Sequence, residues 1–108
     1  MSDRIDNVSV SKKANLFFGG KCVSHSVFSP DGSRKTVGVV LPDSQLTFNV
    51  DAPELMEISG GECRVKIAGE ADFKTYVSGS SFKVAARSSF DIHTGAEAVH
   101  YVCSFGSD

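Results

Sequence analysis

Hydrophobic and polar residues alternate in short segments along most of the chain, and the segments end at residues that favour turns. The segment KCVSHSVFS (21–29) runs into Pro-Asp-Gly, and QLTFNV (45–50) runs into Asp-Ala-Pro. A period of two is typical of half-buried strands, and Pro-Asp-Gly is typical of a turn. Further segments of this kind lie at 35–41, 55–59, 62–69, 73–79, 79–93 and 98–105. About eight to ten short strands predict an all-β fold, either an antiparallel sandwich or a barrel.

The same alternation divides the side chains of each predicted strand between two faces. Met56 and Ile58 share a face with Glu54, so an inward position of this pair carries the carboxylate to the mouth of a barrel. The other sets expected to point inward are Phe82 with Val84, Phe90 with Ile92, and Tyr101 with Cys103 and Phe105.

Two turns are predicted to close hairpins. Residues 79–93 look like two strands joined by small residues, and Gly60-Gly61 fits a tight turn between the segments on either side. No helical pattern follows the two glycines, so they do not indicate a phosphate-binding loop.

Length and charge limit the partners that we expect. At 108 residues the chain is long enough for one domain, at 13–108. It is preceded by a polar arm at 1–12 that is frayed, or that forms an edge strand ordered only by a partner. A formal net charge of −2 gives no electrostatic reason to expect nucleic acid or an anionic membrane as a partner. No apolar run approaches about 18 residues, and the N-terminus lacks the apolar core of a secretory signal. These features predict a cytoplasmic protein.

Cys22, Cys63 and Cys103 are odd in number and far apart in the sequence. Without a secretory signal, this pattern argues against a disulfide framework, and we expect three buried thiols. Cys103 alternates with Tyr101 and Phe105, so it is the cysteine expected to line a pocket.

Several short motifs of the chain occur together and in order in one known family. They are NLFFGGKCVS, DGSRKTVGVVLP, APELMEISGGECRVKIAG, GSSFKV, SSFDI and YVCSF, and they extend from about residue 15 to the end. On these motifs the chain resembles the small cupin-like pyrimidine/purine nucleoside phosphorylases. The resemblance implies a cupin-type jelly-roll barrel, a homodimer, and phosphorolysis of nucleosides to free base and ribose 1-phosphate.

Phosphorolysis makes three demands on a site: it must anchor a phosphate dianion, stabilise positive charge on the ribose, and neutralise charge on the departing base. Because a guanidinium group meets phosphate oxygens in pairs, basic side chains are candidates for the first task. They are Arg34, Lys35, Arg64, Lys66, Lys83 and Arg87. We assign catalytic roles to Arg87, in a turn that can fold over the barrel mouth, and to Glu54, which can hydrogen-bond ribose hydroxyls or face the developing positive charge.

The expected substrate-binding residues combine aromatic rings for the base with hydroxyls and a cation for the sugar and phosphate. They are Lys35, Met56, Ser59, Phe82, Ser88, Phe90, Tyr101 and Cys103. Core packing is the alternative interpretation of the aromatic rings, and a position at the surface is the alternative for the basic side chains.

Two other functions stay open. Metal-dependent cupins carry two histidines two residues apart with a glutamate shortly after, and His25, His93 and His100 lack this spacing. We therefore expect no metal and no other cofactor, whereas an oxygenase or isomerase of this class would purify with iron, zinc or manganese. A non-catalytic cupin that senses a nucleoside or a small anion is the second alternative, and it would bind its ligand without forming product.

Overall fold

The computed structural model describes residues 4–106, and this range forms eleven strands and one turn of 3-10 helix. The strands are β1 (Ser9–Val10), β2 (Asn15–Phe17), β3 (Cys22–Phe28), β4 (Arg34–Val40), β5 (Gln45–Val50), β6 (Glu54–Gly60), β7 (Glu62–Ile67), β8 (Lys74–Val77), β9 (Ser81–Val84), β10 (Ser88–Thr94) and β11 (Val99–Phe105), and the helical turn η1 is Phe18–Gly20. The all-β prediction is confirmed, and each segment predicted as a strand contains one. No helix within residues 4–106 is long and apolar enough to cross a membrane.

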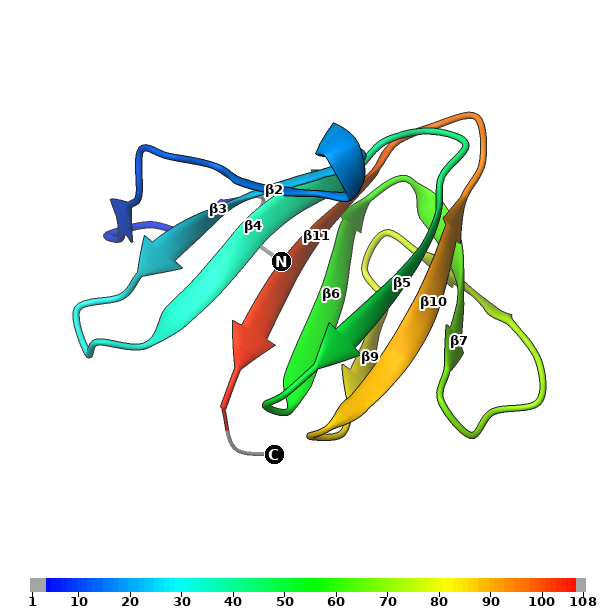
Figure 1. Ribbon diagram of the computed structural model, residues 1–108. Helices are drawn as coiled ribbons and strands as arrows, with labels where there is room; N and C mark the ends of the chain where they lie inside the picture. Colours follow the sequence, from blue (N-terminus) through cyan, green and yellow to red (C-terminus); the bar gives the residue numbers. More distant parts are fainter. Residues whose placement is uncertain (1–3, 107–108) are drawn as a thin grey trace.

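The strands form two sheets that face each other (Figure 1). The larger sheet has the order β1-β3-β4-β11-β6-β9, and β2 also pairs with β3. The smaller sheet has the order β5-β10-β7-β8. Every pair of neighbouring strands is antiparallel.

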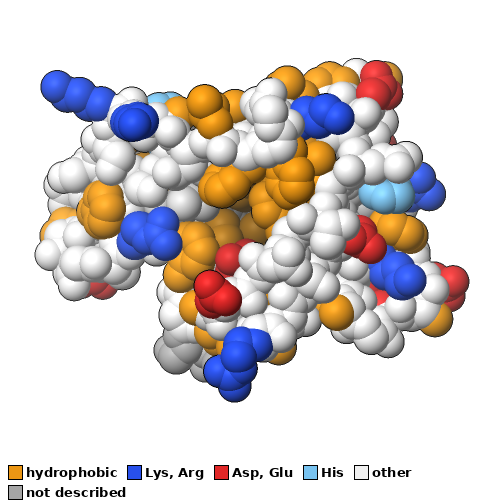
Figure 2. All heavy atoms as spheres, in the orientation of Figure 1, with side chains coloured by type: hydrophobic (Ala, Val, Ile, Leu, Met, Phe, Trp, Pro, Cys, Tyr) orange, Lys and Arg blue, Asp and Glu red, His pale blue; other side chains and the backbone are white. Residues whose placement is uncertain are grey.

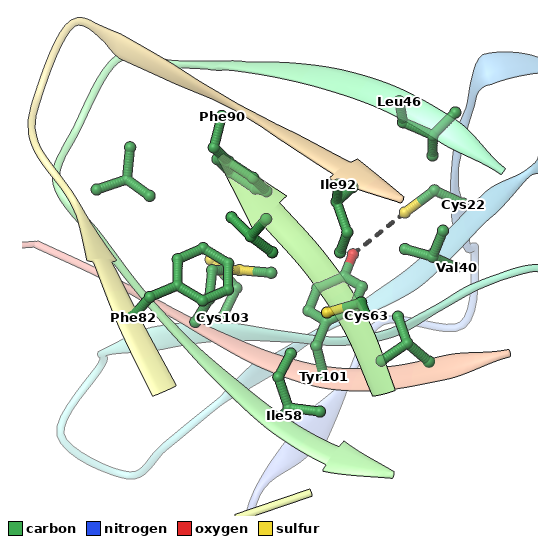
Figure 3. Close-up of a cluster of buried hydrophobic side chains, with 14 of the residues drawn as sticks. Cys22, Val40, Leu46, Ile58, Cys63, Phe82, Phe90, Ile92, Tyr101 and Cys103 are labelled. Atoms are coloured by element: carbon green, nitrogen blue, oxygen red, sulfur yellow. Dashed lines mark hydrogen bonds between the residues drawn. The ribbon is translucent and has the colours of Figure 1, made fainter. Parts of the chain in front are cut away.

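The hydrophobic core lies between the two sheets, at the positions that the alternation predicts. Each of these side chains is at most 6% exposed: Met56, Ile58, Phe82, Val84, Phe90, Ile92, Tyr101 and Cys103. Figure 3 shows side chains from both sheets meeting in this core. All three cysteines are buried and free, as predicted.

The N-terminal arm is an edge strand over part of its length. Ser9 and Val10 pair with β3, and the backbone N–H of Ser11 donates to the carbonyl oxygen of Ser26 at 2.9 Å. Residues 1–3 of the predicted arm lie outside the described range.

The prediction of a hairpin at 79–93 is wrong. Strand β9 pairs with β6 in the larger sheet, whereas β10 pairs with β5 and β7 in the smaller sheet. Residues 85–87 therefore carry the chain from one sheet to the other. The alternation and the small residues are the same for a turn that closes a hairpin and for a link between sheets, so the sequence pattern does not separate the two.

The Gly60-Gly61 turn is also a link between sheets and not a hairpin, because β6 and β7 belong to different sheets. Gly61 has a φ of +74°, and a Cβ atom at this position would lie 2.3 Å from the carbonyl oxygen of Ala98. Only glycine fits both the left-handed backbone and this close approach.

Candidate active site

A cavity of about 290 Å³ opens between the two sheets and is lined by residues of β2, β3, β4, β5, β6, β10 and β11. Its polar side chains are Asn15, Ser24, Arg34, Thr36, Asn49 and Glu54, and its aromatic side chains are Phe17, Phe48, Phe90, Tyr101 and Phe105. Figure 2 shows a hollow between the sheets with hydrophobic side chains on its walls and charged side chains close by. Ligand pockets span roughly 300–1,000 Å³, so this cavity has the size of a small-molecule site.

One wall of the cavity is aromatic. The rings of Phe48 and Phe90 are stacked, with centroids 5.3 Å apart and an angle of 17° between their planes. Phe17 and Phe18 approach Phe48 edge-on, at 6.4 and 5.1 Å. Phe48 comes from β5 and Phe90 from β10, which are neighbours in the smaller sheet. These rings give the cavity an aromatic, apolar wall.

The facing wall, on the larger sheet, carries a positively charged side chain, Arg34. Arg34 is exposed and borders the cavity, and its guanidinium carbon lies 4.3 Å from the centroid of the Phe105 ring. This cation–π contact holds the group against another residue of the cavity lining. Within the described range 4–106, the side chain of Arg34 takes part in no hydrogen bond or ion pair. Its N–H donors therefore remain for a ligand.

Glu54 begins β6 and is half-buried beside this cation. Burial raises the pKa of the Glu54 carboxyl, while a hydrogen bond from Cys103 and the positive charge of Arg34 oppose that rise. The thiol of Cys103 has a pKa raised by its own burial and by the neighbouring Glu54, so it stays protonated and donates to the carboxyl. Thr36 hydrogen-bonds to the same thiol.

Tyr101 forms the floor of the cavity. Its hydroxyl oxygen lies 3.3 Å from the Cys22 sulfur (Figure 3), and burial raises the pKa of this phenol, which keeps it neutral. Gly38 makes room for the ring, because a Cβ atom there would lie 2.7 Å from the tyrosine oxygen. Asn15 donates to the Ser24 hydroxyl at 3.3 Å, which adds a neutral polar group to the floor.

The structure brings together several of the residues predicted from the sequence. Glu54, Met56, Phe90 and Tyr101 line the cavity. Cys103 lies beside them in contact with Glu54. Phe82 packs against Phe90 at a centroid distance of 5.4 Å and belongs to the core without lining the cavity.

Four other predicted residues do not line the cavity. Arg87 is exposed in the link between β9 and β10, with a φ of +53°, and its backbone N–H donates to the carbonyl oxygen of Asp51 at 3.1 Å. Lys35 follows Arg34 on β4 and points to the opposite face. Ser59 borders a groove on the outer face of the larger sheet, and Ser88 begins β10 outside the cavity lining.

Sequence reasoning singled out Arg34 only as one of six basic candidates. The pattern RKTVGVV contains a sharper signal, because Thr36 and Val40 are inward positions and Arg34 shares their parity. Phe48 carries a similar signal, because it shares the parity of the inward residues Leu46 and Val50, whereas Asn15 carries none. They reach the cavity through the packing of strands that are distant in the sequence.

The described residues do not bring together three or more His, Cys, Asp and Glu side chains in a metal-binding arrangement. His93 packs on Phe73 with ring centroids 4.4 Å apart, while His25 and His100 line the groove on the outer face of the larger sheet. These histidines lie outside the cavity between the sheets.

Comparison with known proteins supports one family along nearly the whole chain. The family model described as "Pyrimidine/purine nucleoside phosphorylase" matches residues 12–105. A protein of that name from Thiobacillus denitrificans is 59% identical over 103 residues, which cover 95% of this chain and 98% of that protein.

Solved structures share the fold of this chain. A crystal structure of a protein of unknown function from Acinetobacter sp. ADP1 superposes with a TM-score of 0.93 at 48% identity, covering 97% of this chain and 100% of the other. The cupin domain of Schizosaccharomyces pombe Cnp3, at 18% identity and a TM-score of 0.63, covers 85% of this chain and 64% of its own and shows the fold alone. The prediction of a cupin-type fold is confirmed. The chain belongs to the pyrimidine/purine nucleoside phosphorylase family.

Proposed function

We propose that the protein cleaves purine and pyrimidine nucleosides with inorganic phosphate, giving the free base and ribose 1-phosphate. The observation that carries this proposal is that Arg34 and Glu54 lie together on one side of a cavity whose other side holds the stacked Phe48 and Phe90 rings. The family relationship supports the same reaction.

Each part of the cavity suits one part of the substrates. The guanidinium group of Arg34 holds phosphate oxygens in pairs and places the nucleophile near the anomeric carbon. The base stacks on the aromatic wall, which accepts purines and pyrimidines alike because every base has a π-face. Glu54 lies next to Arg34, where the bond between sugar and base is broken.

The proposed reaction is tested by incubating the purified protein with uridine, cytidine, adenosine, guanosine and thymidine, with and without phosphate. We expect base and sugar 1-phosphate to appear together, and only when phosphate is present. Saturable binding of a nucleoside without product would instead favour the non-catalytic sensor.

We also propose that the protein is a homodimer, formed by the outer faces of two larger sheets. This face carries a groove of about 940 Å³ that includes Val10 and Val37, which are 57% and 39% exposed. In a twofold contact the same valines meet from both copies, which buries apolar surface. The formal net charge of −2 opposes this association only weakly.

Replacing Val37 with aspartate is expected to shift the protein from dimer to monomer, because the contact would then bury a carboxylate from each copy. Sedimentation velocity over a range of protein concentrations measures the change. Val77→Asp is the matched control, since Val77 is 50% exposed on β8 of the smaller sheet. A monomeric unaltered protein, or equal effects of the two variants, would contradict the proposed contact.

A further inference from the structure

The departing base needs a proton source, and the anchoring of phosphate and the stacking of the base do not supply one. When the glycosidic bond breaks, its electron pair goes to the base, and general acids lower the barrier to such steps. A proton donor in the cavity, near the point where the sugar and the base are joined, would therefore speed the reaction.

The strand register builds a cluster of hydrogen-bonding side chains at this place. On β11, Cys103 pairs with Thr36 of β4 on one side and with Met56 of β6 on the other. Glu54 is two residues before Met56 on the same inward face, and Phe105 is its partner on β11. The Thr36 hydroxyl, the Cys103 thiol and the Glu54 carboxyl thus form a continuous hydrogen-bonded series that ends in the cavity.

We propose that Glu54 is the acid that protonates the base as it leaves, and that the Cys103 thiol stabilises the carboxylate that this step creates. The inference rests on the proposed phosphorolysis and assigns a proton-transfer role within it.

The step balances without another reactant. A phosphate oxygen forms a bond to C1′ while the C1′–N bond breaks and leaves its electron pair on the base. The O–H bond of Glu54 breaks, and its proton goes to a ring nitrogen or exocyclic oxygen of the base. The phosphate ester formed from hydrogen phosphate still carries a proton, and transfer of this proton to the Glu54 carboxylate restores the acid.

The surroundings of Glu54 fit a group that gains and loses a proton. Burial favours the protonated carboxyl and raises its pKa, while Arg34 and the Cys103 thiol stabilise the anion that follows proton donation. These two groups are the ionisable side chains that act on Glu54 among the described residues. The neighbouring strand β9 places Val84 opposite Glu54 and contributes no charge at that position.

The other hydroxyl and thiol groups of the cluster are less suited to donate the proton. Burial raises the pKa values of Tyr101 and Cys103 far above their usual range, so loss of either proton at neutral pH is unfavourable. The tyrosine oxygen is already within hydrogen-bonding distance of Cys22. Glu54 is therefore the group in the cavity whose proton is available.

The test compares two nucleosides that differ in their need for a proton. Guanosine must be protonated as the base leaves, whereas 7-methylguanosine already carries a positive charge on its base. Replacing Glu54 with glutamine keeps the size of the side chain and removes the acid. We expect the single-turnover rate with guanosine to fall by about 10²–10⁴-fold and the rate with 7-methylguanosine to fall by less than about tenfold.

Glu57→Gln is the matched control, because Glu57 lies on the same strand and points to the other face. It should leave both rates unchanged. If Glu54→Gln slows both nucleosides equally, or slows neither, Glu54 is not the acid. If the unaltered protein does not accept 7-methylguanosine, uridine and 5-nitrouridine provide the same comparison, since the nitro group makes the base a better leaving group.

Two variants test the role of Cys103 as a positioning residue. Cys103→Val removes the donor and should slow guanosine more than 7-methylguanosine, whereas Cys103→Ser keeps a donor and should preserve the ratio of the two rates. Equal slowing of both nucleosides by Cys103→Val, or no slowing, would overturn this role. A lack of phosphate-dependent cleavage by the unaltered protein with every nucleoside would refute the proposed function itself, which is a distinct outcome.

Discussion

Replacing Arg34 with glutamine is expected to slow phosphorolysis by about 10²-fold, the loss that follows when a reacting group is misplaced by about 1 Å in an active site. The physical reason is that Arg34 supplies the guanidinium group of the cavity lining, and that its side chain, held over Phe105, makes no hydrogen bond or ion pair among residues 4–106. The apparent KM for phosphate should rise more than that for the nucleoside. Initial rates measured over a grid of phosphate and nucleoside concentrations, at constant ionic strength, separate the two.

Arg87→Gln is the matched control for this prediction. Arg87 has the same charge and is exposed like Arg34, but it lies in the link between the sheets and does not line the cavity. Glutamine can keep its positive φ no worse than arginine does. We expect this variant to keep nearly full activity. A large loss of activity with Arg87→Gln and none with Arg34→Gln would contradict this assignment. Arg87, the residue expected from the sequence, would then be the one that binds phosphate.

Replacing Gly61 with alanine is expected to destabilise the fold by more than about 4 kcal/mol, which is exceptional for one methyl group. The added Cβ atom would meet the carbonyl oxygen of Ala98 at 2.3 Å, and because this is a backbone atom, relief requires a shift of the link between β6 and β7 or of the residue just before β11. Total stabilities of small domains are about 5–15 kcal/mol, so the variant should be close to unfolding at ambient temperature. Urea unfolding followed by circular dichroism measures the loss.

Gly19→Ala separates the steric clash from backbone strain. Gly19 has a similar φ of +66°, but a Cβ atom there meets nothing within 4 Å. Replacing Gly19 with alanine should lower the free energy of unfolding by about 1–2 kcal/mol, the penalty of the left-handed conformation alone. If both variants lose the same free energy of unfolding, the backbone around Gly61 can shift to avoid the clash with Ala98 at no energetic cost, which would contradict this prediction.

The predictable part of this fold is its local pattern. Segments such as 45–50 coincide with a strand because a period of two needs only neighbouring residues to be recognised, and the same period places Phe90 and Ile92 in the core. Which of the two sheets a strand joins depends on residues that are distant in the sequence. The links at 60–61 and 85–87 were assigned to hairpins because nothing near them in the sequence reveals that the next strand pairs elsewhere.

The same distinction applies to the site. Glu54 was placed at the mouth of the interior by its spacing from Met56 and Ile58, which is a property of one strand. The prediction that Arg87 folds over the mouth of the barrel depended on a hairpin at 79–93. Because β9 and β10 belong to different sheets, Arg87 does not line the cavity. Phe48 becomes part of the site only when β5 pairs with β10, so its contribution needed the three-dimensional structure.

The most direct measurement is a crystal structure determined with ribose 1-phosphate. The expected result is density for the sugar between the sheets, with phosphate oxygens within about 3 Å of the Arg34 guanidinium and the anomeric carbon facing Glu54 and the Phe48–Phe90 pair. Density for the ligand beside Arg87 or in the outer groove, with the cavity between the sheets left to water, would contradict the assignment of this cavity as the site of phosphorolysis.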